Sequence, residues 1–369
     1  MDVLCALFTA IIHLPRSVAT PIPSARYLVT REYNSSDLYA NWPTYQDLPL
    51  HPSFPTKAAW GVWGPEDEFG ALNHITPTTI QAAKSEIREG IAISLNLGLD
   101  MPNPPLPKTR QGLTHAIIPL SGYQDDVLTL NTQVSTQFDG LRHYPYSTNG
   151  DVSTYQFYND LISFSDIMSP TNVTTLGIQN SAQKGIAGRA ILLDWAGWMD
   201  SQNLTFSAFS EQGITATELD AVATWEGLPP DFTKPGDFLI VRTAMTKQYK
   251  ELSLHDQEVL PFRDHFDFLG VEASDEILEW MWNKKLSMVG SDNIAFEAGA
   301  LTATIDGTPG RNLHQVFIGG WGQSIVELLD LEELAETCHR LRRFSFFFTI
   351  QNLNVPGGIA SPPNALAIL

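Results

Sequence analysis

The chain lacks the features that mark several common classes of protein. Only two cysteines occur among its 369 residues, Cys5 and Cys338, too few for a disulfide framework or a thiolate zinc site. Lys and Arg number 22 against 41 Asp and Glu, and the net charge of −19 repels phosphate backbones and anionic lipid surfaces. No Gly-rich phosphate loop, nucleophile elbow or His-Glu-x-x-His helix is present. The sequence therefore gives no support for cysteine chemistry, nucleic-acid binding, nucleotide binding, serine hydrolysis or a zincin.

The N-terminus has the pattern of a signal peptide rather than of a membrane anchor. Residues 3–14 form an apolar run too short to span a membrane, and a small-x-small cleavage site follows at 17–19. Against this interpretation, the region before the run carries Asp2 and no Lys or Arg. We predict a signal peptide over residues 1–19 and a protein that is secreted or enters the secretory pathway, with a cytoplasmic location as the alternative.

The composition is that of one folded unit with an extension. Hydrophobic content of 43% and charged content of 17% are globular values, and no linker separates two independent halves. We predict an N-terminal extension over residues 20–59 and a catalytic domain over 60–369. Glycosylation would agree with secretory passage, and acceptor sequons stand at Asn34, Asn172 and Asn203.

Helix and strand patterns alternate along the chain, which argues for an α/β protein. Thr76 and Pro77 predict a helix start, with an apolar side that continues until Gly90. The tail, residues 352–365, has too many turn formers for a regular element. Further helices are expected at 216–225, at 274–283 with Ser274 as cap and at 330–343 with Asp330 as cap, and strands at 91–97, 116–120, 128–135, 189–193, 237–242, 286–290 and 344–350.

Asp139 and His143 are the first candidates for chemistry, because a carboxylate and an imidazole can bind a metal or move protons. Gly140 between them argues against a simple helical salt bridge, so we interpret the pair as part of a functional loop at the end of a strand. An equally weighted alternative is structural. In that alternative Asp139 caps a turn and His143 packs against Tyr144 and Tyr146.

His314 and Glu327 stand far down the chain, each within a mostly apolar run. A lone buried histidine is more often a satisfied core residue than a ligand, and a buried carboxylate needs a partner that offsets its desolvation. Two isolated polar groups in neighbouring apolar runs can serve one another or share an ion. Both interpretations stay open on this pattern alone.

Several separate segments, in order, resemble the cyclase family that includes bacterial kynurenine formamidase and isatin hydrolase, and most closely its fungal branch. The resemblance covers most of the chain from about Trp60 onward. It rests on residues 63–73, 135–143, 188–194, 234–243, 291–297, 313–327 and 356–365. The resemblance implies a single α/β domain of the swivelling β/β/α type.

The family's hydrolases carry a His-x-Gly-Thr-His-x-Asp-x-Pro-x-His motif, which is altered here. Residues 133–143 read Gln-Val-Ser-Thr-Gln-Phe-Asp-Gly-Leu-Arg-His, so that Gln133 and Gln137 replace the two early metal-binding histidines. A dinuclear site is therefore not expected. Amide oxygen in place of imidazole shifts the preference from zinc toward a harder divalent ion such as manganese.

The ligands that the family pattern leaves imply one metal site. It would consist of Asp139, His314 and Glu327, with Gln137 as a weak oxygen ligand. The mechanism implied by the resemblance is attack of metal-activated water on a carbonyl, with His143 as the proton shuttle and Asp139 beside it.

The leading hypothesis is a metal-dependent hydrolase or cyclase that acts on an amide, lactam or lactone bond of a small molecule, in fungal secondary metabolism. One alternative is a metal-independent cyclase or lyase in which Asp139 and His143 perform acid/base chemistry alone. Another is a secreted small-molecule-binding protein that has kept the fold and lost catalysis. Neither nucleic acid nor a membrane is expected as a partner, and a homo-oligomer is left open.

Overall fold

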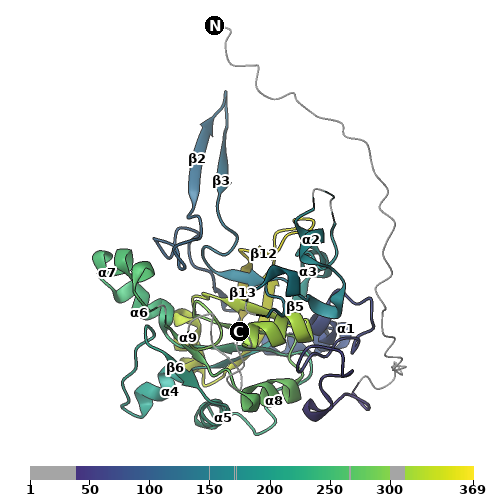
Figure 1. Cartoon of the computed structure of the whole chain (residues 1–369). Helices are drawn as coiled ribbons and strands as arrows, with labels where there is room; N and C mark the ends of the chain where they lie inside the picture. The colour runs from purple at the N-terminus through teal and green to yellow at the C-terminus, as the bar shows by residue number, and fades with distance from the viewer. Residues whose placement is uncertain (1–38, 149, 170, 172, 266, 300–311) are drawn as a thin grey trace.

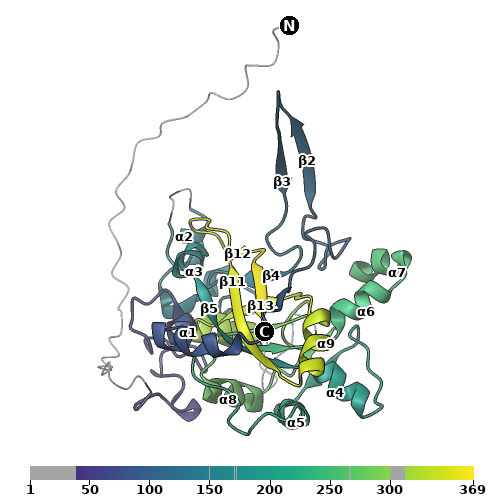
Figure 2. The same ribbon diagram turned by 180° about the vertical axis from the view of Figure 1, so that it is seen from behind.

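The computed structural model describes residues 39–369 except 149, 170, 172, 266 and 300–311 (Figures 1 and 2). The predicted signal peptide, Cys5 and the sequons at Asn34 and Asn172 lie outside the described residues. Asn203 is exposed, which is what a glycosylation site requires. Cys338 is a fully buried free thiol that packs in the core.

Among the described residues, nine strands form the main sheet, in the order β1-β13-β11-β5-β7-β9-β10-β4-β12. The central pairs β5–β7, β7–β9 and β9–β10 are parallel. The pairs that flank them, β11–β5 and β10–β4, are antiparallel. Its strands are β1 (Ala92–Ser94), β4 (Gln137–Asp139), β5 (Ile186–Leu193), β7 (Phe238–Val241), β9 (Met288–Ser291), β10 (Ser324–Glu327), β11 (Ser345–Gln351), β12 (Ala360–Ser361) and β13 (Asn364–Ile368).

Two small two-stranded sheets accompany the main one. They pair β2 (Thr114–Pro119) with β3 (Gln124–Thr129), and β6 (Gln212–Ile214) with β8 (Leu269–Val271). The β2–β3 hairpin stands out from the body of the molecule in both ribbon views.

Helices connect the parallel strands, as parallel pairing requires. The helices of the described chain are α1 (Pro77–Ala83), α2 (Phe164–Ile167), α3 (Gln179–Lys184), α4 (Trp195–Ser201), α5 (Ala216–Trp225), α6 (Met245–Glu251), α7 (Leu254–Val259), α8 (Asp275–Lys284) and α9 (Glu332–Leu341). Of these, α4 and α5 lie between β5 and β7, and α6, α7 and α8 lie between β7 and β9. Thr76 caps α1 and Ser274 caps α8, which confirms both predicted helix starts. In the described part of the chain, no helix is long and apolar enough to cross a membrane.

Successive side chains along the central strands point to opposite faces of the sheet, so apolar residues form two cores, one on each face. In β5, Ile191 and Leu193 belong to the first core, which α4, α5 and α8 cover, whereas Ala190 and Leu192 belong to the second, which α9 covers. The mixed order, the curled sheet and the single domain confirm the predicted α/β fold.

The segment before residue 60 is part of this folded unit. Tyr45, Leu48 and Ala58 are buried in the first core. The Nε1 atom of Trp282 in α8 donates a hydrogen bond to the backbone oxygen of Pro43 at 2.9 Å. Residues 39–59 therefore cover the sheet together with the helices, and the limits of a catalytic domain remain a prediction.

Three predictions are wrong, one of them only in part. The predicted strand 128–135 breaks because Asn131 Oδ1 accepts the backbone N–H of Gln133 at 2.9 Å, a turn that separates β3 from β4. The tail is irregular over residues 352–359, as predicted, but not at its end, because β12 pairs with β4 and β13 lies between β1 and β11. Asp330 does not cap α9, since its carboxylate pairs with Lys250 Nζ at 2.7 Å.

Glu226 at the end of α5 makes stability depend on pH. Burial raises its pKa to about 9, although it accepts the backbone N–H of Asp194 at 2.7 Å. Between the ordinary glutamate pKa and about 9 the unfolded chain releases this proton and the folded chain keeps it, so stability falls as pH rises. We expect Glu226→Gln to raise the melting temperature at pH 8 by roughly 2–4 °C and to leave it unchanged at pH 4.

The control for Glu226→Gln is Glu336→Gln, which removes an exposed carboxylate from α9. Scanning calorimetry at both pH values measures the two variants beside the wild type. An equal shift of Glu226→Gln at pH 4 and pH 8 would show that the carboxyl is ionised in the folded protein.

Candidate functional site

Strands β4 and β10 place three polar side chains on one face of the sheet. Gln137 lies directly opposite Glu327 in the antiparallel register, and Asp139 lies opposite Ile325. Phe138, between Gln137 and Asp139, points into the second core. Because side chains alternate along a strand, the carboxylates of Asp139 and Glu327 share the other face.

His314 reaches these carboxylates from the start of a π-helix. This helix, η8 (Gln315–Trp321), is buried in the first core, and π-helical turns are frequent at functional sites. His314 Nε2 lies 3.0 Å from Glu327 Oε1 and 3.5 Å from Asp139 Oδ2. Sequence positions 139, 314 and 327 therefore meet at one buried point.

The Asp139–His314–Glu327 cluster fits a divalent metal ion. One ligand atom from each residue lies within 4.8 Å of the others. Asp139 Oδ2 is buried and accepts no hydrogen bond in the described structure. A buried carboxylate oxygen without a hydrogen bond is costly, and a cation would satisfy it. Two carboxylates and one imidazole form a donor set that divalent zinc or manganese accepts.

Glu297 orients the imidazole of His314. Its Oε2 atom lies 2.6 Å from His314 Nδ1, and its side chain is 1% exposed. A carboxylate on the far nitrogen of a metal-binding histidine fixes the tautomer and raises the basicity of the ligand. This role was missed from the sequence, although a glutamate between Phe296 and Ala298 raises the same question of a buried charge as Glu327 does.

Gln133 and Gln137 hydrogen-bond to the carboxylates of the cluster. Gln133 Nε2 donates to Asp139 Oδ1 at 2.5 Å, and Gln137 Nε2 donates to Glu327 Oε2. The Gln137 oxygen accepts from Arg110 Nη1 at 3.0 Å. In this arrangement Gln137 turns its nitrogen toward the site, and its role as an oxygen ligand stays a prediction.

His314 and Glu327 of the cluster line a cavity of about 190 Å³. His143 and Tyr144 line this cavity beside His314 and Glu327, and Arg110 faces it from the loop before β2. His143 Nε2 lies 3.8 Å from Asp139 Oδ2, too far for a hydrogen bond. The imidazole is therefore close to the cluster and has room to contact a ligand in the cavity.

Electrostatics in the site follow from burial and close pairing. Burial would raise the pKa of Asp139, but His143 and His314 lower it to about 2. Burial raises the pKa of Glu327, and the charge of Asp139 adds to the effect. Burial would lower the pKa of His314, but Glu297 and the two cluster carboxylates raise it well above its ordinary value. Burial lowers the pKa of His143 against the pull of Asp139.

A family model described as Putative cyclase matches residues 71–298 of the chain, well over half its length. The chain belongs to the cyclase family. The match ends one residue after Glu297, so His314 and Glu327 come from the part that follows it. No curated protein matches the chain.

Solved structures agree with the cyclase fold. A structure described as a novel cyclase aligns with a TM-score of 0.71 and 26% identity over 85% of this chain and 97% of its own. Isatin hydrolase A from Labrenzia aggregata bound to benzyl benzoate aligns at a TM-score of 0.50 and 14% identity, over 77% of this chain and 94% of its own. An isatin hydrolase bound to the product analogue thioisatinate aligns at 0.50 and 13%, over 80% and 99%. At such identities the isatin hydrolases support the fold alone.

Glu297 offers a test of how this cyclase-family chain holds its histidine. We expect Glu297→Gln to weaken binding of manganese or zinc by about 10–100-fold, because the amide supports the imidazole less well than a carboxylate. Titration of metal-stripped protein by calorimetry measures the change.

The matched control for Glu297→Gln is Asp292→Asn. Asp292 is also fully buried, but it hydrogen-bonds to Thr243, through the hydroxyl at 2.8 Å. Metal affinity should stay at the wild-type value in this control. An equal loss in both variants would mean that the effect comes from general destabilisation rather than from the support of His314.

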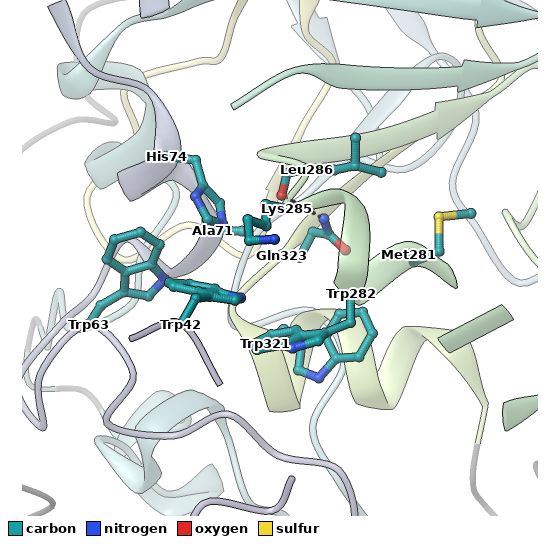
Figure 3. Close-up of a pocket in the computed structure, with 10 residues that line it drawn as sticks. All are labelled: Trp42, Trp63, Ala71, His74, Met281, Trp282, Lys285, Leu286, Trp321 and Gln323. Atoms are coloured by element: carbon teal, nitrogen blue, oxygen red, sulfur yellow. Dashed lines mark hydrogen bonds between the residues drawn. The ribbon is translucent and has the colours of Figure 1, made fainter. Parts of the chain in front are cut away.

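A separate pocket, lined by tryptophans, has none of the cluster residues (Figure 3). Its cavity of about 20 Å³ has room for a single water molecule. Trp42 Nε1 and Gln323 Oε1, from two of its lining residues, are buried without a hydrogen-bond partner in the described structure. Burial and the charge of Lys285 lower the pKa of His74 in this pocket to about 3.

Proposed function

We propose that the chain is a metal-dependent hydrolase or cyclase acting on an amide, lactam or lactone bond of a small molecule. The observation that carries this proposal is the convergence of Asp139, His314 and Glu327, two of which line a cavity, with Asp139 Oδ2 left without a hydrogen bond. Membership of the cyclase family supports the same class of reaction.

Asp139, His314 and Glu327 would hold one divalent ion, manganese or zinc. Bound there, such an ion supplies a water of lowered pKa and polarises the carbonyl to be attacked. Gln133 and Gln137 keep the two carboxylates in place by donating hydrogen bonds to them. Because both glutamines stand where the family's hydrolases carry histidine ligands, we propose a mononuclear centre.

His143 would move the proton. Its imidazole lines the cavity 3.8 Å from Asp139 Oδ2, with its side chain 22% exposed. In hydrolysis it takes a proton from the attacking water and gives it to the leaving nitrogen or oxygen. In cyclisation, the reverse, it takes a proton from the attacking group and gives one to the departing water.

Arg110 would bind the polar part of the substrate. Its Nη1 atom donates to Gln133 O at 2.8 Å and to Gln137 Oε1, which fixes the guanidinium at the edge of the cavity. Its Nη2 atom makes no hydrogen bond within the described structure and is available to a carbonyl or carboxylate. The small volume of about 190 Å³ suits a compact ring compound.

The proposed kind of enzyme, its biological role and its location follow from the sequence and its resemblance to the family. We propose a kynurenine formamidase-like enzyme of the fungal branch, with a role in secondary metabolism and with residues 60–369 as its catalytic part. Secretion and glycosylation belong to the same proposal. N-terminal sequencing of the secreted protein tests it, since an intact Met1 would contradict cleavage.

A metal-free acid/base enzyme is the second candidate, and one observation favours it. Glu327 has partners on both oxygens without an ion, namely His314 Nε2 at 3.0 Å and the amide of Gln137. Asp139 and His143 would then carry the proton transfers alone. This candidate leaves the buried Asp139 Oδ2 unexplained.

Chelation separates the two candidates. We expect the purified protein to hydrolyse at least one member of a panel of formamides, lactams and lactones, to lose this activity with EDTA, and to regain it with manganese or zinc. Calcium serves as the control ion, because it prefers more oxygen ligands than this cluster offers. Activity that survives chelation would support the metal-free enzyme. Binding of a panel compound without turnover would support the non-catalytic binding protein.

A further inference from the structure

Arg110 is anchored through one nitrogen of its guanidinium and leaves the other two unused. Its Nη1 atom donates to Leu106 O at 3.1 Å, to Gln133 O at 2.8 Å and to Gln137 Oε1 at 3.0 Å. Within the described structure, Nε and Nη2 donate no hydrogen bond, although the residue lines the cavity of the metal cluster. The guanidinium is therefore fixed at one end and has free donors at the other.

Arg110 also has no ion pair with a described carboxylate. Arg242, by contrast, pairs with Asp194 at 2.7 Å. Burial lowers the pKa of Arg110, and only the more distant charges of Glu327 and Asp139 oppose this effect. An ion held by the cluster would offset those two carboxylates and leave the guanidinium without a balancing charge. A partly buried cation in that position is costly, and an anionic ligand would stabilise it.

We propose that Arg110 forms an anion subsite beside the metal cluster and that the substrate is a ring compound with a carboxylate group. This inference rests on the proposed function, because it names the substrate class of the same cavity. Nε and Nη2 of a guanidinium present two parallel N–H bonds, and a carboxylate accepts such a pair through both of its oxygens.

The subsite lies next to the end of the cavity where the bond would be broken. Only the side-chain amide of Gln137 stands between the guanidinium and Glu327, since its oxygen accepts from Arg110 and its nitrogen donates to Glu327 Oε2. Gln133 makes a second link, because its backbone oxygen accepts from Arg110 and its Nε2 donates to Asp139 Oδ1 at 2.5 Å. A compact ring can therefore place its carboxylate on Arg110 and its reacting carbonyl at the cluster.

The lining of the cavity suits an apolar ring with one negative group, although the chain carries a net charge of −19. Among the described residues that line it, Glu327 is the one carboxylate and Arg110 the one arginine or lysine. An ion pair is stronger in such surroundings than in water. Most of the other lining residues are apolar or aromatic, namely Pro107, Tyr144, Phe268, Ile294 and Ala295.

The role of Arg110 would be recognition and not bond breaking. A carboxylate on the ring keeps its charge from the bound substrate to the transition state, so its contact with Arg110 stabilises both equally. Binding of that kind lowers KM and leaves kcat unchanged. A guanidinium that served the developing charge on the carbonyl oxygen would instead change kcat.

The first test compares benzoate with benzamide, which has the same shape and no charge. Calorimetric titration of metal-stripped protein excludes binding of the carboxylate to an ion. Wild-type protein should bind benzoate about 10–100-fold more tightly, the usual range for hydrogen bonds to a charged group. Arg110→Gln should bind the two probes equally. Equal affinities in the wild type, or a preference that persists in Arg110→Gln, would overturn the proposal.

Lys108→Gln is the matched control for charge. It removes one positive charge from the same loop, at an exposed residue whose Nζ lies 5.4 Å from the ring centre of Phe262. The preference for benzoate should keep its wild-type value in this variant. An equal loss in Lys108→Gln and Arg110→Gln would mean that overall charge, and not a subsite at Arg110, selects the anion.

Arg110→Lys separates the anion subsite from a structural role, because Arg110→Gln also removes the hydrogen bonds of Nη1. This variant keeps the positive charge and loses the paired N–H bonds, so it should retain part of the preference for benzoate. Benzamide reports whether the cavity itself is intact, and its affinity should stay at the wild-type value. Loss of both probes in both variants would show that Arg110 shapes the cavity and would overturn the proposal.

The second test uses turnover and distinguishes failure of the subsite from failure of the proposed function. Amides, lactams and lactones are assayed in pairs, with and without a carboxylate on the ring. KM should be about 10–100-fold lower for the carboxylates, and Arg110→Gln should remove this difference with little change in kcat. A fall in kcat that is equal for both members of a pair would contradict recognition. Benzoate binding through Arg110 without turnover of any compound would support the subsite and refute the hydrolase.

Discussion

Replacement of His314 by glutamine is expected to abolish turnover and to weaken metal binding by more than 100-fold. His314 Nε2 is the atom that lies between the carboxylates of Asp139 and Glu327, at 3.5 and 3.0 Å. Losing a ligand should cost more than the roughly 10–100-fold effect of losing its hydrogen-bond support. Glutamine is preferred to alanine because it leaves less of a cavity among the buried carboxylates.

The control for His314→Gln is His339→Gln, which removes an imidazole that pairs with Asp194 at 2.7 Å outside the site. Calorimetric titration with manganese and a turnover assay should be run on both variants. Wild-type metal affinity in His314→Gln would show that the histidine is a structural partner of the carboxylates and not a ligand.

Replacement of His143 by alanine is expected to lower kcat by about 10²–10⁴-fold, the usual contribution of a general acid/base group. Metal content should stay at the wild-type value, because His143 is not one of the three residues that converge. The separation of turnover from metal binding distinguishes a proton shuttle from a ligand.

Imidazole in the buffer provides a check on His143→Ala, since it can enter the space left by the side chain and restore part of the activity. Tyr144→Phe is the matched control, because Tyr144 lines the same cavity and its ring packs at a tilt against His314, with 5.1 Å between ring centroids. Its hydroxyl accepts from Asn312 at 2.9 Å, so its loss should change KM more than kcat. A His143→Ala variant with unchanged kcat would remove the shuttle from the mechanism.

The sequence predicted correctly those helices whose limits depend on their own residues. Helix α5 occupies Ala216–Trp225, the predicted range, and Ser274 accepts the N–H of Ile277 as the predicted cap of α8. The errors come from contacts made across the chain. Strand β13 forms because it pairs with β1 on one side and with β11 on the other, and the sequence of residues 364–368 does not indicate this pairing.

In the site, too, the residues could be predicted from the sequence, whereas the contacts between distant residues could not. Sequence reasoning singled out Asp139, His143, His314 and Glu327, and the family resemblance joined them. Their meeting depends on the antiparallel pairing of β4 with β10, a contact between residues almost 190 positions apart that no local pattern reveals. Arg110 was missed because it stands in a Pro-rich loop without periodicity, and only the folded structure turns it toward the cavity.

The central claim is that Asp139, His314 and Glu327 hold one divalent ion. Elemental mass spectrometry of the purified protein, after incubation with manganese and zinc and removal of free metal, tests it most directly. We predict about one ion per chain in the wild type and none in His314→Gln. A wild type that stays free of metal would contradict the account and leave the acid/base enzyme and the binding protein as the remaining explanations.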